Sequence, residues 1–240
     1  MRFTILYTLL FFLAILMPVL PIEAAEIPSP ASIPAENAKQ SGRPVASRVL
    51  FIGDSMTGWL GERMNAYGVE NGYDVATIVW DGSTIRKWGS KSARLQEYVD
   101  KLQPDVIFIS LGLNELAERN PQSQLASSLK SILKAAGDVP VIWVGPPSWP
   151  GKSFGETLDT WLAGQLGNGH YYSSLDLTLA RQSKTNPHPS RAGIDKWVDT
   201  LMLWLPEHGA VALPGYAVPP ASKAHSRGKT FIYRRMKESL

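Results

Sequence analysis

The sequence predicts an α/β protein in which a parallel sheet of five strands is covered by helices on both faces, a three-layer α/β/α sandwich. Three observations predict this class. Short runs that are apolar throughout recur along residues 48–206, as strands buried on both faces do. Segments with the spacing of amphipathic helices separate these runs. The regular alternation of strand and helix favours parallel strands, because each crossover helix packs back onto the sheet.

The strands are predicted where apolar runs end at glycine or at polar residues. The first run stops at Gly53, as a fully buried strand would. The helices are predicted from apolar stripes and from residues that begin helices: Asn120 and Pro121 supply a cap and a first helical residue, and Ser190 caps the last helix. The predicted strands are residues 49–52, 75–79, 106–110, 139–144 and, more weakly, 171–175; the helices include 95–102, 125–136, 158–162 and 194–205.

Both ends of the chain differ from this middle part. Residues 1–25 combine a positive start with a long apolar run, which is typical of an export signal or of an uncleaved N-terminal anchor. Residues 26–47 are rich in Pro, Ala and Ser and are interpreted as a linker, and residues 207–240 as a Pro-containing basic tail. We therefore expect one domain, residues 48–206, that is periplasmic or secreted and that contacts a membrane only through the N-terminal segment.

Composition and charge exclude several classes of protein. The chain has 240 residues, of which 44% are hydrophobic, as in a globular protein. Its net charge of +3 arises in the last twenty residues, where six basic side chains and Glu238 give a balance of +5, so the remaining 220 residues sum to −2. A nucleic-acid-binding fold is therefore not indicated. The absence of cysteine excludes disulfides and thiolate catalysis.

Residues suited to catalysis follow the predicted strands, at the edge where parallel sheets bind ligands. Ser55 ends a Gly-Asp-Ser turn that exposes its hydroxyl near the positive end of a helix. Gly82 follows the second strand and allows close approach of the backbone, and Asn114 follows the third with an amide N–H for an oxyanion. His188, on a Pro-flanked loop, suits a general base. Taken singly, a turn glycine and a capping asparagine are the simpler interpretations of Gly82 and Asn114.

Taken together and in this order, Ser55, Gly82, Asn114 and His188 resemble the four motif blocks of the SGNH (GDSL-like) hydrolase family, over essentially all of residues 48–206. The resemblance implies a flavodoxin-like sandwich, with Ser55 as nucleophile and His188 as base. It also implies an oxyanion hole made by the backbone N–H groups of Ser55 and Gly82 and by the Asn114 amide. The Gly-x-Asn-Glu sequence around Asn114 is similar to that of bacterial polysaccharide and cell-wall O-acetylesterases.

One position departs from the family pattern. An aspartate three residues before the histidine orients the imidazole in the family, and here that position is Thr185. Three interpretations stay open. A backbone carbonyl replaces the carboxylate and leaves a Ser–His dyad, or another carboxylate such as Asp176 reaches His188. In the third, the protein is a weakened enzyme or a non-catalytic glycan-binding module.

The resemblance implies a carboxylic ester hydrolase that forms an acyl-enzyme and needs neither a metal nor a cofactor. Export favours an acylated carbohydrate, with a short group such as acetyl, or another small ester. Four tryptophans near predicted strand ends have rings able to stack on sugars, although packing in the core explains each of them at least as well: Trp80, Trp88, Trp143 and Trp149. The alternative activity is that of an O-acetyltransferase of an exported polysaccharide, using the same site.

Overall fold

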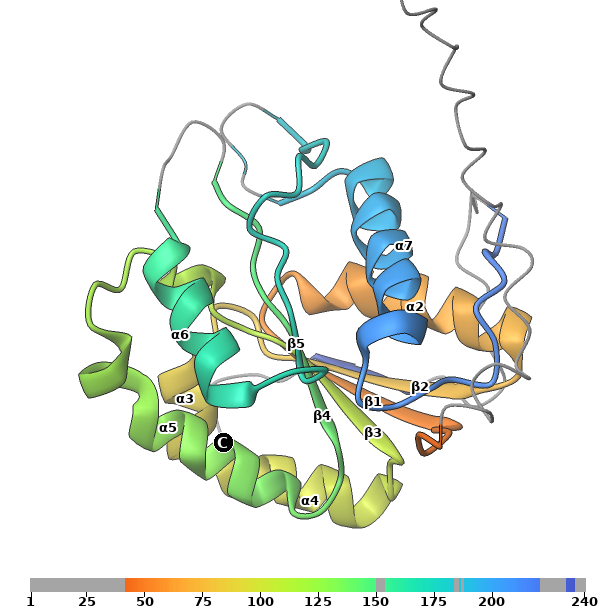
Figure 1. Cartoon of the computed structure of the whole chain (residues 1–240), viewed down its shortest axis with the longest axis horizontal. Helices are drawn as coiled ribbons and strands as arrows, with labels where there is room; N and C mark the ends of the chain where they lie inside the picture. Colours follow the sequence, from red (N-terminus) through yellow and green to blue (C-terminus); the bar gives the residue numbers. More distant parts are fainter. Residues whose placement is uncertain (1–41, 150–153, 184–185, 187, 221–231, 236–240) are drawn as a thin grey trace, which may run out of the picture.

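A six-stranded parallel sheet forms the centre of the protein (Figure 1). The computed structural model describes residues 42–149, 154–183, 186, 188–220 and 232–235. Five strands are the predicted ones, and their order β5-β4-β3-β1-β2 is that of flavodoxin-like sheets, which confirms the predicted parallel α/β fold. The strands are β1 (Arg48–Gly53), β2 (Asp74–Val79), β3 (Val106–Ser110), β4 (Val141–Val144), β5 (Tyr171–Tyr172) and β6 (Ile232–Arg235).

Helices cover both faces of the sheet. The helices α2 (Thr57–Asn71) and α7 (Arg191–His208) lie on one face. The other face carries α3 (Ile85–Ser90), α4 (Ser92–Leu102), α5 (Pro121–Ala136) and α6 (Glu156–Leu166). Asn120 caps α5 and Ser190 caps α7 through their side chains, as predicted.

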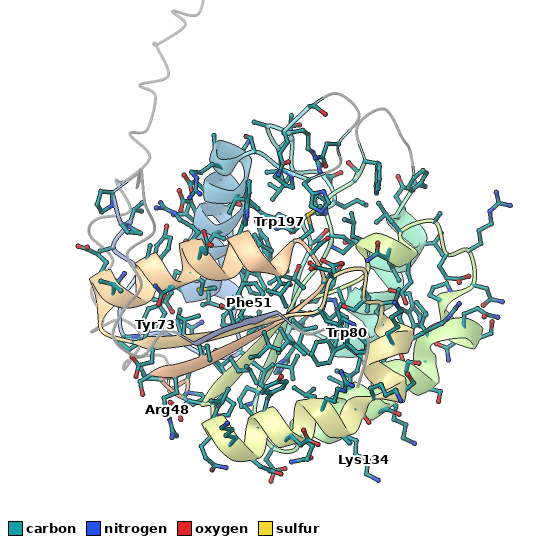
Figure 2. All side chains as sticks on the ribbon, turned by 180° about the vertical axis from the view of Figure 1, so that it is seen from behind. Arg48, Phe51, Tyr73, Trp80, Lys134 and Trp197 are labelled. Atoms are coloured by element: carbon teal, nitrogen blue, oxygen red, sulfur yellow. The ribbon has the colours of Figure 1, made fainter. Side chains whose placement is uncertain are left out.

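The sheet separates two hydrophobic cores, and the strand sequences explain why. Successive side chains of a strand point to opposite faces, so Phe51 of β1 joins Trp197 of α7 in one core while Ile52 joins Trp88 of α3 in the other. Figure 2 shows Phe51 and Trp197 on the α2 and α7 side and Trp80 on the opposite side. Because both faces are buried, most positions of these strands are apolar, which is the pattern that predicted the strands.

The packed region extends beyond the expected range 48–206 at both ends. Ala46 donates a backbone hydrogen bond to Ala212 at 2.8 Å, and Ala212 and Leu213 are fully buried. The guanidinium of Arg43 donates to carbonyls at the end of α7, among them Gly209 at 2.9 Å. The tail also supplies β6, which pairs with β2. Apolar residues between the prolines of the tail therefore belong to the core, and part of the basic segment belongs to the sheet.

The interpretation of residues 1–25 as a signal or anchor lies outside the described residues. Among the helices that the structure describes, none is long and apolar enough to cross a membrane.

Candidate active site

Ser55 lies on the turn between β1 and α2, and its Oγ is 3.0 Å from Nε2 of His188. The structure thus brings together two residues that are 133 positions apart in the chain. The turn is tight because Gly53 packs against β3, where a Cβ atom would lie 2.1 Å from the Ser110 carbonyl oxygen. Glycine is therefore required immediately before the Asp-Ser pair.

The carboxyl group and the backbone carbonyl of Asp54 hold the turn that carries Ser55. Its Oδ1 accepts a hydrogen bond from the backbone N–H of Met56 at 2.9 Å, and its carbonyl accepts one from Thr57 at 3.1 Å. Asp54 is 1% exposed. Burial raises the pKa of Asp54 to about 7, with smaller contributions in the same direction from the charges of Glu115 and Asp81 and an opposing one from the Met56 N–H.

His188 is oriented by an amide rather than by a carboxylate. Its Nδ1 lies 2.8 Å from Oδ1 of Asn186, and its backbone N–H donates to the same oxygen at 3.0 Å. Thr185, the position at which the family has aspartate, lies outside the described residues. Asp176 is exposed and has no hydrogen bond to His188 in the described part of the chain. Among the described residues, neither a backbone carbonyl nor Asp176 lies within hydrogen-bond distance of Nδ1 of His188. The group that does is the side-chain amide of Asn186, two residues before the histidine.

Gly82 and Asn114 lie at the same edge of the sheet, and Asn114 contacts the β2–α3 segment that contains Gly82. Gly82 has a φ of +62°, a left-handed conformation that favours glycine. The Asn114 side chain donates from Nδ2 to the carbonyl of Ser83, the residue after Gly82, at 2.8 Å. The Ser83 hydroxyl accepts a hydrogen bond from Trp88 Nε1 at 3.0 Å. Asn114 thus supports the segment that contains Gly82, and both residues are exposed.

Glu115 fixes the other side of this segment. Its Oε2 accepts a hydrogen bond from the backbone N–H of Ile85 at 2.9 Å, and its Oε1 accepts one from Arg86 at 3.2 Å. Burial raises the pKa of Glu115, against the effect of these two N–H groups. The Glu115 side chain thus spans from the short 3₁₀ helix η2 (Leu113–Glu115), which follows β3, to the first turn of α3.

A cavity of about 260 Å³ opens beside Ser55 and His188. Its wall includes Trp59 of α2, which is 37% exposed, and Asp81 of the β2–α3 segment. Arg191 lies over the Trp59 ring, with its guanidinium carbon 5.7 Å from the ring centroid. The residues that line the cavity are Ser55, Met56, Trp59, Asp81, Gln182, His188, Pro189 and Ile194.

The tryptophans singled out near the strand ends are not in this cavity. Trp88 and Trp143 are fully buried and Trp80 is 6% exposed, all in the core on the α3 side. Trp149 is partly buried against the other core. The stacking interpretation is therefore wrong for Trp80, Trp88 and Trp143, because their rings point into the packed layer. Trp59 of α2, which follows no predicted strand directly, is the tryptophan that lines the cavity.

Among the described residues, no group of three or more His, Asp or Glu side chains is arranged to hold a metal ion.

The comparisons with known proteins give matches to solved structures alone. No protein-family model and no curated protein matches. A G-D-S-L family lipolytic protein from Desulfitobacterium hafniense DCB-2 is similar over 65% of this chain and 97% of its own, with 16% identity and a TM-score of 0.46. A family 3 carbohydrate esterase from Clostridium thermocellum is similar over 65% and 92%, with 18% identity and a TM-score of 0.44. A GDP-L-fucose synthetase from Naegleria fowleri is similar over 80% and 50%, with 13% identity and a TM-score of 0.27.

Proposed function

We propose that this chain is a serine ester hydrolase that removes short acyl groups, acetyl above all, from a carbohydrate outside the cytoplasm. The observation that carries the proposal is the 3.0 Å contact between Ser55 Oγ and His188 Nε2 beside a cavity. A hydroxyl within hydrogen-bond distance of an imidazole, whose other nitrogen is held by a third group, is the arrangement that activates a serine nucleophile.

In the proposed reaction Ser55 Oγ attacks the ester carbonyl carbon while His188 Nε2 accepts the hydroxyl proton. The tetrahedral intermediate collapses, the C–O bond to the alcohol breaks, and the alcohol leaves with the proton from His188. Water then attacks the acyl-enzyme and gives a proton to the same Nε2. The carboxylic acid is released as the proton returns to Ser55.

The oxyanion of each intermediate is proposed to be bound by the backbone N–H groups of Ser55 and Gly82 and by the Asn114 amide. Within the part of the chain that the structure describes, neither backbone N–H has a hydrogen-bond acceptor. The Asn114 amide carries two N–H groups and uses one on the Ser83 carbonyl, which leaves the second for the substrate.

Two features support a short acyl group on a sugar. The cavity, at about 260 Å³, is smaller than the range of about 300–1,000 Å³ typical of sites for drug-sized ligands. The exposed ring of Trp59 in its wall offers a flat apolar surface of the kind on which sugars stack. The export signal predicted for residues 1–25 supports a substrate outside the cytoplasm.

The test is hydrolysis by the purified chain of p-nitrophenyl acetate, butyrate and octanoate, followed by acetate release from O-acetylated oligosaccharides. Activity is expected to be highest with acetate and to be lost in Ser55→Ala and in His188→Ala. Ser127→Ala, which removes an exposed hydroxyl on α5, is the matched control and is expected to keep full activity. Undiminished hydrolysis by Ser55→Ala contradicts the proposal.

The same assay separates the alternatives. Transfer of acetyl from a donor to the oligosaccharide, in place of acetate release, identifies an O-acetyltransferase that uses the same site. Oligosaccharide binding without hydrolysis, and without labelling of Ser55 by an organophosphonate, identifies a glycan-binding module and contradicts the proposed chemistry.

A further inference from the structure

We propose that Asn186 is the positioning residue of His188, and that its side-chain amide oxygen selects the imidazole tautomer in which Nδ1 carries the hydrogen. The inference rests on the proposed serine hydrolase function. It concerns Asn186, which follows the Thr185 position and for which the sequence pattern predicts no role.

The orientation of the Asn186 amide follows from the backbone of His188. The amide atom at 2.8 Å from Nδ1 also lies 3.0 Å from the backbone nitrogen of His188. A backbone N–H is always a donor, so the atom that faces it must be an acceptor. The amide oxygen meets this requirement, whereas an NH₂ group in its place would set two donors against each other.

The tautomer follows from the amide orientation. Because an amide oxygen can only accept, Nδ1 of His188 must be the protonated nitrogen. The neutral ring then has its lone pair on Nε2, which is 3.0 Å from Ser55 Oγ. The serine hydroxyl therefore donates to His188, as general-base catalysis requires.

Gln182 holds the other end of the amide. Its Oε1 accepts a hydrogen bond from Asn186 Nδ2 at 2.9 Å, and its backbone N–H donates to the His188 carbonyl at 3.0 Å. Rotation of the Asn186 amide would break three hydrogen bonds at once. An asparagine that presents its NH₂ group to Nδ1 imposes the wrong tautomer and lowers the rate of a serine protease about 10⁴-fold. Here the three hydrogen bonds hold the amide oxygen toward Nδ1, so Asn186 supports the productive tautomer.

A neutral amide orients the ring but adds no negative charge beside it. The titratable acidic groups on the elements around His188 are Asp81, which lines the same cavity, and Asp54, which is buried under the nucleophile turn and whose pKa burial raises to about 7. Arg181 precedes the loop and Arg191 follows it at the start of α7. A carboxylate in place of the amide would lie in direct contact with Nδ1 and would stabilise the imidazolium, so the ring would take up a proton at higher pH.

The experiment compares Asn186→Asp and Asn186→Leu with the parent, each as the full chain. In Asn186→Asp the acid limb of the pH–rate profile, and the midpoint of the His188 ring titration followed by NMR, are both expected to move up by about one pH unit or more. In Asn186→Leu kcat is expected to fall about 10²- to 10⁴-fold, with KM changed much less. Asn120→Asp, the same change of charge at the start of α5, is the control and is expected to move neither quantity.

Two results would overturn the inference. One is a parent-like rate and pH profile in Asn186→Leu. The other is an unmoved His188 titration in Asn186→Asp, which is nearly isosteric and keeps the acceptor for the backbone N–H. The His188 titration is measured without substrate, so it tests the role of Asn186 even if undiminished activity of Ser55→Ala contradicts the proposed hydrolase mechanism. If instead Ser55→Ala loses activity and Asn186→Leu keeps the parent rate, the proposed function stands and only the role of Asn186 is refuted.

Discussion

The Glu115 carboxylate lies 2.9 Å from the backbone nitrogen of Ile85 and joins the 3₁₀ helix η2, which follows β3, to the first turn of α3. Together with the bond from the Asn114 amide to the Ser83 carbonyl, it fixes the segment that carries Gly82. The two neighbouring residues after β3 therefore have complementary tasks in the proposed site. One offers an N–H to the oxyanion, and the other holds the backbone that supplies a second N–H.

Shortening the Glu115 side chain is expected to lower kcat more strongly than it lowers the free energy of unfolding. In Glu115→Asp the carboxylate loses one methylene and cannot reach both the Ile85 and Arg86 N–H groups. We expect kcat to fall about 10- to 100-fold, less than the 10²–10³-fold typical of deleting an oxyanion donor, with KM changed little. Glu118→Asp, which alters the exposed ion pair of Glu118 with Arg86, is the control for steady-state kinetics. Equal kcat values for the two variants would show that Glu115 has no positioning role.

A second group of contacts ties the C-terminal segment to α2 and is expected to govern stability. Arg63 is 2% exposed and lies 2.9 Å from Asp199 of α7, and its guanidinium also donates to the Pro219 and Pro220 carbonyls at 3.3 Å. Arg63→Met removes the donor to both carbonyls and leaves Asp199 with the Tyr67 hydroxyl as a donor, at 2.9 Å. Breaking such a buried pair typically costs about 3–5 kcal/mol, and Asp199 is partly exposed, so we expect the lower end of that range.

Urea unfolding measures this loss, and a double-mutant cycle with Asp199→Asn assigns it. We expect a coupling free energy above about 1 kcal/mol. Rates with p-nitrophenyl acetate are expected to stay at the parent value, because the contacts lie outside the cavity wall. Simple additivity of the two substitutions would contradict the pairing.

The sheet was predictable because burial on both faces leaves continuous apolar runs, as in β1 and β3. β6 was not, because Ile232–Arg235 lies within a basic segment that resembles a solvated tail. A strand at the edge of a sheet tolerates charged residues, so composition alone does not separate it from a tail. The expected end of the domain at residue 206 was too early for a related reason. The apolar residues of the tail stand in short pieces between prolines, and such pieces give no periodic pattern from which packing could be predicted.

The nucleophile and the base were predictable from their motifs, whereas the group that orients the base was not. Sequence spacing directs attention to Thr185, three residues before His188. Asn186 acts from two residues before, because one oxygen there reaches both the backbone and the ring of His188. Likewise, strand-end position does not tell which way a ring points. Trp80 turns into the core, and Trp59 on a helix faces the cavity.

Trp59 is expected to contribute to binding of the sugar rather than to the chemical step. In Trp59→Ala we expect KM for an O-acetylated oligosaccharide to rise about tenfold, since stacking and burial of such a ring contribute about 1–2 kcal/mol. The kinetics with p-nitrophenyl acetate should change less. Leu203→Ala, which removes an exposed apolar side chain on α7, is the control. A fall in kcat with unchanged KM would assign Trp59 to the catalytic geometry instead.

The buried Asp54 carboxyl is expected to make the folded protein less stable as the pH rises from 4 to 7. Its pKa is about 7 in the folded chain, against 3.8 as the ordinary value. Between these two pH values the unfolded chain has released the proton and the folded chain retains it. Because the unfolded state binds fewer protons, the free energy of unfolding falls as the pH rises. The fall is at most about 1.4 kcal/mol per pH unit from this group. The contribution is complete below pH 4 and lost above pH 7. Asp54→Asn keeps an acceptor for the Met56 N–H and has no proton to lose.

Urea unfolding of Asp54→Asn and of the parent at several pH values from 4 to 7 checks this expectation. Every other carboxyl group is common to both proteins, including Asp105, whose pKa the Arg48 guanidinium lowers to about 2, so the effects of these groups cancel in the difference. The variant should gain stability relative to the parent steadily up to pH 7, with no further gain above it. A difference that stays constant across this range would mean that Asp54 is ionised in the folded protein, and that the Met56 N–H outweighs the cost of burial.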